Sequence, residues 1–331
     1  MLKTRLTEKL GIEKPILCGG LMWLGTAEYV AGVVNGGAMG YITPRSYPNE
    51  ADFVDALRRC RRLTGGRPFG VNLYISARPE ENVRLTRWIE ILAQEGVQHV
   101  ETAGYSPAKF LPSLKAANSI VVHKATSVRH AVAAAKAGVD VVVLLGAECG
   151  GHPGQADISS MILAARALDQ VDIPVVVGGG IGSGAQLAAA LTLGVDGVLI
   201  GSRMLVADEI WAHADYKDHI LKLDETCSTT VLSALKNTYR CLANDTAAEV
   251  RALEASGVRD YETLGPLVGG QGQLPAYKTG DRTKGILSLG PAASWCDRRE
   301  PAAAILTRLA DDAEKALAAA SARFVQHAVP A

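Results

Sequence analysis

Short apolar runs recur along the first two-thirds of the chain, and each ends at glycine or a small polar residue. Alanine-rich stretches between them, such as 127–138 and 184–194, have helical composition and stop at glycine. The runs are 15–20, 36–43, 69–75, 97–104, 119–126, 139–146, 172–180 and 194–201. Apolar strands alternating with helices predict a parallel sheet covered on both faces. Eight such units in roughly 200 residues favour an α/β fold of the closed (β/α)8 TIM-barrel type over an open doubly wound sheet.

The pattern changes after Arg203. Two stretches, 228–240 and 247–256, have helical composition, and we interpret the glycine-rich segment 267–285 as a loop. The closing stretch, 300–326, has the spacing of one amphipathic helix that packs back on the barrel. We therefore predict a barrel built from residues 1–221 and 299–331, with 222–298 forming a smaller helical lobe over one of its faces.

Composition narrows the classes of function. The 331 residues carry 34 Lys and Arg against 34 Asp and Glu, and this zero net charge argues against a nucleic-acid surface. The apolar runs are far shorter than the ~20 residues that span a bilayer. The charged amino terminus lacks the apolar stretch of a signal peptide. Six cysteines without a CxxC pair indicate neither a zinc site nor a disulfide framework. We expect a cytoplasmic protein with no metal and no membrane or nucleic-acid partner.

Candidate chemistry lies where the strands end, because the active site of such a barrel is built at the C-terminal ends of its strands. Polar and glycine residues follow almost every apolar run. They are Gly19 and Gly20, Asn72, Glu101, Lys124, Glu148 to His152, Gly178 to Gly184, and Gly201 with Ser202.

The loops after the seventh and eighth runs, GGGIGSG and GSR, together predict a phosphate site. Glycine lets backbone N–H groups approach a phosphate, and a following helix adds the positive end of its dipole. Residues 180–185 also match the dinucleotide fingerprint GxGxxA. That fingerprint needs an acidic residue at the end of the next strand, and the GSR sequence there supplies none.

Lys124 and His152 are the side chains with the clearest chemical potential. Lys124 closes an apolar strand, so its ammonium needs an anionic partner. That partner is either Glu101 on the adjacent strand or a negative charge that develops on a cofactor ring. His152 follows Gly150 and Gly151, which leave room for a flat ligand, and histidine suits proton abstraction near neutral pH.

Several motifs together resemble the nitronate monooxygenase (2-nitropropane dioxygenase) family of FMN-dependent TIM barrels along nearly the full chain. Any one of them alone would be a weak signal, whereas their combination in this order is specific. They are PILCGGLMWLG, FGVN, VETAG, HKATSVRHA, GAECGGHPG, PVVVGGGIGSG and DGVLIGSRML.

The resemblance implies a residue-by-residue assignment of the site. His152 matches the catalytic histidine, which takes a proton from the carbon that bears the nitro group. Apart from the resemblance, Tyr277 and Lys278 lie in the glycine-rich segment and are candidates for the substrate entrance, although a solvated loop would also explain them. The residues implied for FMN are Gly20, Leu21, Met22, Asn72, Lys124, Gly150, Gly151, Gly179, Gly180, Gly201 and Ser202.

The implied reaction is oxidation of small nitronates or nitroalkanes by O2 to a carbonyl and nitrite, through a flavin semiquinone whose negative charge Lys124 would balance. The implied partners are a small-molecule substrate and O2, with NADH as a possible electron donor and a monomer or homodimer as the assembly. Three positions depart from the family pattern: Cys18 and Leu21 in the strand-one loop, and Leu287 where relatives carry tryptophan. These departures affect the predicted identity of the substrate more than the predicted binding of the flavin.

Other functions use the same fold. An NADH:quinone reductase of the same family would need a nicotinamide channel, and its close subgroup has glutamate where this chain has Gln155. Flavin enoyl-thioester reductases share an ESGGHxG pattern, from which Cys149 and Pro153 depart. A barrel that only binds a phosphate ligand would be colourless, whereas a flavoprotein is yellow.

Overall fold

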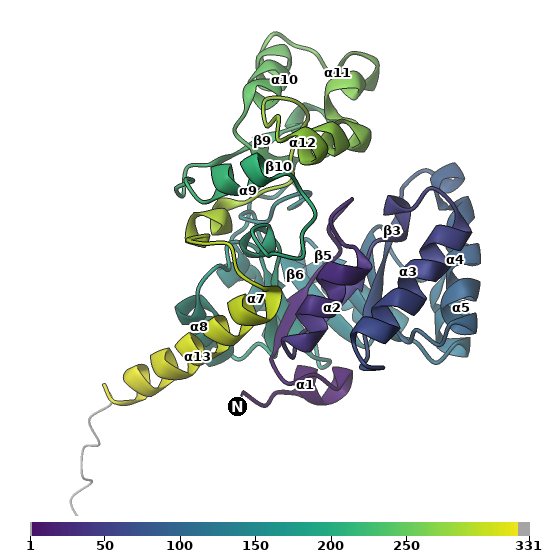
Figure 1. Ribbon diagram of the computed structural model, residues 1–331, viewed down its shortest axis with the longest axis vertical. Coiled ribbons are helices and arrows are strands. Elements are labelled where there is room, and N and C mark those ends of the chain that lie inside the picture. Colours follow the sequence, from purple (N-terminus) through teal and green to yellow (C-terminus); the bar gives the residue numbers. More distant parts are fainter. Residues whose placement is uncertain (1, 324–331) are drawn as a thin grey trace, which may run out of the picture.

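Eight parallel strands form a closed barrel in chain order in this computed structural model, which describes residues 2–323 (Figure 1). Each strand falls within one of the eight apolar runs, so the predicted (β/α)8 barrel is confirmed. The strands are β1 (Ile16–Cys18), β2 (Met39–Ile42), β3 (Gly70–Ile75), β4 (His99–Gly104), β5 (Ile120–Ala125), β6 (Val141–Leu145), β7 (Val175–Gly178) and β8 (Gly197–Ile200).

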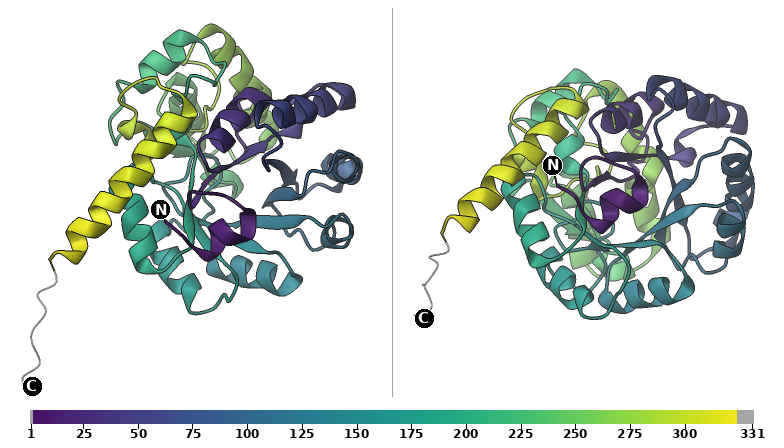
Figure 2. Two further views of the ribbon diagram at one scale, coloured as in Figure 1. Left: turned by 60° about the horizontal axis from the view of Figure 1, so that its bottom comes forward. Right: turned by 90° about the horizontal axis from the view of Figure 1, so that it is seen from below.

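Helices follow the strands and form the outer ring of the barrel (Figure 2). Their polar faces are exposed, while their apolar faces pack with the outward side chains of the strands in the main core. They are α2 (Ala27–Asn35), α3 (Glu50–Leu63), α4 (Val83–Gln94), α5 (Leu111–Ala116), α6 (Val128–Ala137), α7 (Ser160–Leu168) and α8 (Gly184–Leu193).

Helix α1 (Arg5–Leu10) closes the amino-terminal end of the barrel, and Figure 2 shows it lying across that end. Leu6 and Leu10 are buried among the inward side chains of the strands. Arg5 donates two hydrogen bonds, of 2.9 and 2.7 Å, to the carboxylate of Asp196 at the start of β8. The site must therefore lie at the opposite, C-terminal end.

Helix α13 (Ala302–Ser321) supplies the eighth helix of the ring, because it packs between α8 and α2. Gly184 permits its close approach, since a Cβ there would lie 2.5 Å from Cβ of Asp312. The predicted closing helix is present over this range, and residues 324–331 of the predicted barrel segment lie outside the described residues.

The chain between β8 and α13 forms the lobe above the carboxyl ends of the strands (Figure 1). Val231, Tyr239, Val250, Leu264 and Ile286 form an apolar cluster of its own. Its elements are α9 (Ala214–Ile220), β9 (Ser228–Val231), β10 (Tyr239–Leu242), α10 (Asp245–Ala255), α11 (Tyr261–Val268), the 3-10 turn η5 (Gly270–Gly272), α12 (Gln273–Thr279) and the 3-10 turn η6 (Pro291–Trp295).

Two local predictions in the lobe are wrong. The stretch 228–240, which we expected to be helical, is an antiparallel hairpin in which β9 pairs with β10. β-Branched Thr229, Thr230 and Val231 favour extended backbone, and this preference outweighed the alanine and leucine at the turn. The segment 267–285 is not one loop, because η5 and α12 occupy much of it. Its glycines lie at the ends of these elements instead.

Candidate active site

Charged and polar side chains of β3, β4 and β5 meet inside the mouth of the barrel. Glu101 is fully buried, and its Oε2 accepts hydrogen bonds from Nδ2 of Asn72 at 2.5 Å and from Nζ of Lys124 at 3.0 Å. The backbone N–H of Gly20 donates to the same oxygen at 3.0 Å. Oε1 of Glu101 has no partner among the residues that the structure describes. One carboxylate thus organises three strand ends and keeps an acceptor unused.

The ion pair that we considered for Lys124 is present, and it leaves the lysine 13% exposed. The pair has no net charge, and the lysine ammonium has further donors because it can make three hydrogen bonds. The ion pair is therefore compatible with a second partner in the barrel mouth.

The loop after β1 runs directly over these side chains. A Cβ at Gly20 would lie 2.4 Å from Cβ of Asn72, so only glycine fits there. Leu21 and Met22 follow in a turn and are partly buried. The next residue, Trp23, has a φ of +66° and donates its indole N–H to the carbonyl of Gly270 in η5 at 2.9 Å. This loop is therefore tied to the lobe as well as to the barrel.

Unpaired backbone donors gather after β7 and β8. Gly179 and Gly180 have φ values of +111° and +73°. Within residues 2–323, the N–H groups of Gly179, Gly180 and Gly201 have no hydrogen-bond partner. A Cβ at Gly201 would meet nothing closer than a Leu21 methyl at 3.9 Å, so the space beside it is open. Backbone donors around an open space are the arrangement that binds phosphate.

Other groups in these loops are already paired. The side-chain oxygen of Gln186 accepts from the N–H groups of Gly182 and Ser183, at 2.9 and 3.1 Å, in the capping box of α8. Oγ of Ser202 accepts from the N–H of Gly290 at 2.9 Å. Gly290 belongs to residues 280–301, which lead from α12 back to α13 and which we call the returning chain. The bond therefore links the β8 loop to the returning chain of the lobe. The unpaired N–H donors are thus those of Gly179 and Gly180 before α8 and that of Gly201 after β8.

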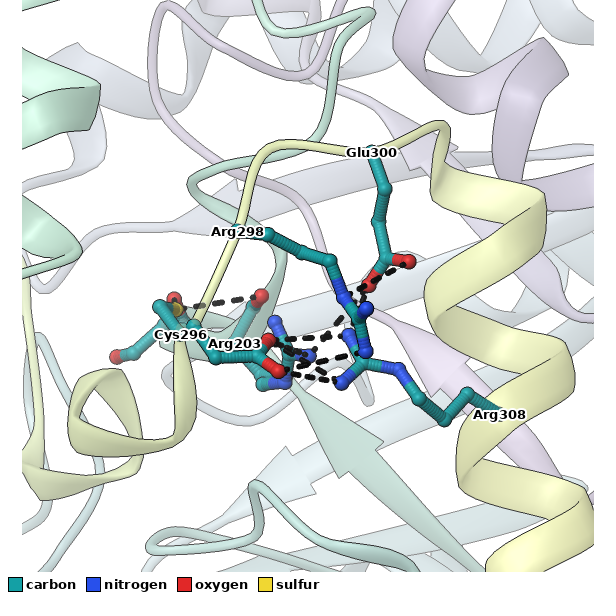
Figure 3. A network of polar contacts seen from close by, with 7 residues as sticks. Arg203, Cys296, Arg298, Glu300 and Arg308 are labelled. Atoms are coloured by element: carbon teal, nitrogen blue, oxygen red, sulfur yellow. Dashed lines mark hydrogen bonds and ion pairs between the residues drawn. The ribbon is translucent and has the colours of Figure 1, made fainter.

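Arg203, the residue after Ser202, belongs to a network of ion pairs (Figure 3). Arg203 is 2% exposed, and its Nη2 lies 3.5 Å from Asp297 and 3.7 Å from Glu300. Arg308 of α13 also contacts both carboxylates. The network joins the end of β8, the returning chain and α13, so it holds the β8 loop in place.

The loop after β6 makes close contacts with the lobe. A Cβ at Gly150 would lie 2.9 Å from the carbonyl carbon of Leu289, so this glycine makes room for the returning chain. Gly151 has a φ of +90°, and it exchanges two backbone hydrogen bonds with Arg240 of β10. We predicted that these glycines clear space for a ligand, and the contacts found here are with the lobe.

His152 lies at the end of this loop, against residues that precede and begin β10. Its Nδ1 is 3.3 Å from the carbonyl oxygen of Thr238, and its ring meets the ring of Tyr239 edge-on at 4.8 Å. A carbonyl can only accept, so Nδ1 carries the proton in neutral imidazole and Nε2 is left as a base. Burial against the lobe lowers the pKa of His152 from its usual 6.5, because it disfavours the charged imidazolium. The exposed part of the ring limits this lowering.

Cys149 is not poised as a nucleophile. Burial raises the pKa of its thiol to about 11, so it is protonated near neutral pH. In the described range 2–323, no three His, Cys, Asp or Glu side chains are arranged to hold a metal ion. Over the same range, no helix is long and apolar enough to cross a membrane.

Tyr277 and Lys278 occupy different environments. Tyr277 is 2% exposed in α12, where its ring packs edge-on against Tyr216 at 5.2 Å and Trp211 at 6.4 Å. Lys278 is exposed on the same helix. The structure therefore places Tyr277 in an aromatic cluster of the lobe, away from solvent.

Thr238, Tyr239 and Arg240 contact the β6 loop and were missing from our site prediction. The alternation of residues 238–242, TYRCL, was the available signal for a strand. Glu101 was noticed as a strand end but was not assigned to the site, because its position between three donors arises only when the strands meet.

Comparison with known proteins identifies the family. The sequence profile of nitronate monooxygenase matches residues 3–312. The chain therefore belongs to the nitronate monooxygenase family, whose members are flavin-dependent oxidoreductases. A probable nitronate monooxygenase of Staphylococcus saprophyticus is 30% identical over 68% of this chain and 74% of the relative. The solved structure of FabK from Thermotoga maritima superposes with a TM-score of 0.89 at 27% identity, over 98% of this chain and all of that one.

A further relative carries a different name. A (3aS,4S,5R,7aS)-5-hydroxy-7a-methyl-1-oxo-octahydro-1H-indene-4-carboxyl-CoA dehydrogenase of Rhodococcus jostii is 34% identical over 63% of this chain. The match spans only 56% of that relative's length.

Proposed function

We propose that the chain is an FMN-dependent oxidoreductase that oxidises small nitronates and nitroalkanes with O2. In the balanced reaction, two nitronates and one O2 give two carbonyl compounds and two nitrite ions. The observation that carries the proposal is His152, whose Nδ1 faces the carbonyl of Thr238 so that Nε2 remains a base.

The residues present fit a phosphorylated, flat cofactor at this end of the barrel. The unpaired N–H groups of Gly179, Gly180 and Gly201 would bind the phosphate of FMN, with Ser202 beside them. Asn72, Lys124 and the Gly20–Met22 loop would contact the ring and its side chain. The flavin supplies the electron acceptor when it is bound, which no side chain of the site can provide.

The protein's own part in the chemistry is to move one proton and balance one charge. Nε2 of His152 takes the proton from the carbon that carries the nitro group, which yields the nitronate anion. The lowered pKa of His152 keeps the imidazole neutral at pH 7 and thus able to accept that proton. The ammonium of Lys124 stabilises negative charge that develops beside it.

The test compares a neutral nitroalkane with its preformed nitronate, because the nitronate has already lost the proton. We expect His152→Asn to lower turnover of the nitroalkane by at least about 100-fold, the scale of general-base catalysis. Turnover of the nitronate should fall much less. Nitrite release measures both reactions, and anaerobic mixing with NADH measures flavin bleaching separately. Equal loss on both substrates, or a colourless purified protein, would refute the proposal.

A second candidate is oxidation or reduction of an acyl-CoA thioester. The Rhodococcus jostii relative, named as a carboxyl-CoA dehydrogenase, favours it. Full bleaching of the flavin by NADH, followed by reoxidation with an enoyl thioester and no response to nitronate, would establish this candidate instead.

A further inference from the structure

Three consecutive residues of the lobe contact the β6 loop. The carbonyl of Thr238 faces Nδ1 of His152, and the ring of Tyr239 meets the imidazole edge-on. The backbone of Arg240 accepts from the N–H of Gly151 at 2.9 Å and donates to its carbonyl at 2.7 Å. The β6 loop is thus attached as an extra edge to the β9–β10 hairpin.

Arg240 also reaches the beginning of the same loop. Its Nε donates to the carbonyl of Ala147 at 2.7 Å, and its Nη1 donates to Oγ of Ser228 on the neighbouring strand at 3.2 Å. One residue therefore contacts both Ala147 and Gly151, on either side of Glu148, Cys149 and Gly150. The side chain is partly buried.

The loop needs such support because it is rich in glycine. Gly150 and Gly151 precede His152 directly, and glycine has the largest backbone freedom to lose on ordering. Without an external contact, the imidazole would sample several positions. Displacing a catalytic group by about 1 Å can cost about 100-fold in rate.

We infer that Arg240 is a positioning residue: its guanidinium fixes Ala147 at the start of the β6 loop, while its backbone holds Gly151, so that His152 faces the substrate. This inference rests on the proposed function, in which His152 is the base. It makes the lobe part of the proton-transfer machinery as well as a cover for the barrel.

The test uses Arg240→Met in the full-length, flavin-loaded protein, since methionine keeps an unbranched apolar stem, removes the side-chain donors to Ala147 and Ser228, and leaves the backbone bonds to Gly151 in place. Arg251→Met is the matched control, because Arg251 lies on the same lobe and its exposed side chain donates to Oγ1 of Thr229. We expect Arg240→Met to lower turnover of the neutral nitroalkane by about tenfold. Turnover of the nitronate should change by less than about twofold, and Arg251→Met should change neither.

Nitrogen NMR of the histidine side chains gives a readout that does not depend on activity. In the wild type, the His152 signals, assigned with His152→Asn, should show one dominant tautomer with the proton on Nδ1. In Arg240→Met, these signals should shift toward those of a mixture of the two neutral tautomers, with the proton on Nδ1 or on Nε2. Arg240→Lys should bring the signals part of the way back to those of the wild type.

Unchanged His152 signals in Arg240→Met would overturn the inference. Equal loss of turnover on nitroalkane and nitronate would also overturn it, because this is the result of a general structural defect. If the wild type oxidises neither substrate, the proposed function fails, and the NMR comparison still decides whether Arg240 positions His152.

Discussion

Two groups of three neighbouring strands in the barrel wall present different chemistry to its mouth. Strands β3–β5 carry Asn72, Glu101 and Lys124 on their inward side, and His123 of β5 contacts the hydroxyl of Thr102 on β4. Strands β6–β8 read VVVLL, VVVG and GVLI, without one titratable side chain. The loops that follow β6–β8 supply backbone N–H donors, together with the side chains of Glu148 and His152 after β6.

This difference separates two kinds of binding. Side-chain charges in a buried setting can respond to a change of charge on a ligand, but each needs a partner in the absence of ligand. Backbone donors hold a constant negative charge such as phosphate and carry no titration of their own. We expect Lys124 of β5 to balance charge on the bound ligand, and the backbone donors after β7 and β8 to set the affinity for its phosphate.

The largest predicted effect comes from breaking the Glu101–Lys124 pair. Lys124→Met leaves the fully buried carboxylate of Glu101 without a cation, and we expect a loss of about 3–5 kcal/mol in the free energy of unfolding. Denaturant unfolding measures it. The double variant Glu101→Gln with Lys124→Met should recover much of the loss, because no buried charge then remains. If the loss of unfolding free energy in the double variant equals the sum of the losses in Glu101→Gln and Lys124→Met, the two residues are not coupled and the prediction is wrong.

A smaller effect concerns acid stability. Burial, with the nearby charge of Lys124, lowers the pKa of His123 to about 4, against about 6.5 in the unfolded chain. The unfolded state therefore binds an extra proton between these values. Stability from this group is full above pH 6.5 and is lost as the pH falls toward 4, by at most about 1.4 kcal/mol per pH unit.

Thermal unfolding measured from pH 7 to 4.5 tests this contribution. His123→Gln, which keeps a hydrogen-bonding side chain beside Thr102, should flatten the decline. His130→Gln removes an exposed positive charge of α6 that also helps to lower the pKa of His123, so it should flatten the decline by a smaller amount. If the stability of His123→Gln falls with pH as steeply as that of the wild type, groups other than His123 cause the acid sensitivity.

The smallest predicted effect is at the phosphate end. Gly201→Ala adds a methyl group to open space at a non-left-handed position, so the fold should tolerate it. The methyl would occupy part of the proposed phosphate site and weaken FMN binding by about tenfold, or about 1.4 kcal/mol. Fluorescence titration of the apoprotein with FMN measures the affinity. Gly270→Ala, also facing open space, is the control and should bind FMN like the wild type.

Much of the barrel could be predicted because its signals are local. Each strand is a short apolar run, most helices of the barrel have a cap or a glycine stop, and their order along the chain specifies neighbouring strands. The hairpin at 228–240 was missed because its strands are short and partly exposed, with alanine and leucine at the turn that also suit a helix. Whether such short segments become strand or helix depends on the partner strand with which they can pair.

The sequence alone determined the number and order of the strands, the glycines after β7 and β8, and the candidate residues Asn72, Lys124 and His152. These features are carried by single residues or short patterns. Only the tertiary structure decided that Glu101 gathers three donors, and that Arg240 joins a loop about 90 residues earlier in the chain. Such contacts form between distant segments, so their geometry arises only when the barrel closes and the lobe packs on its mouth.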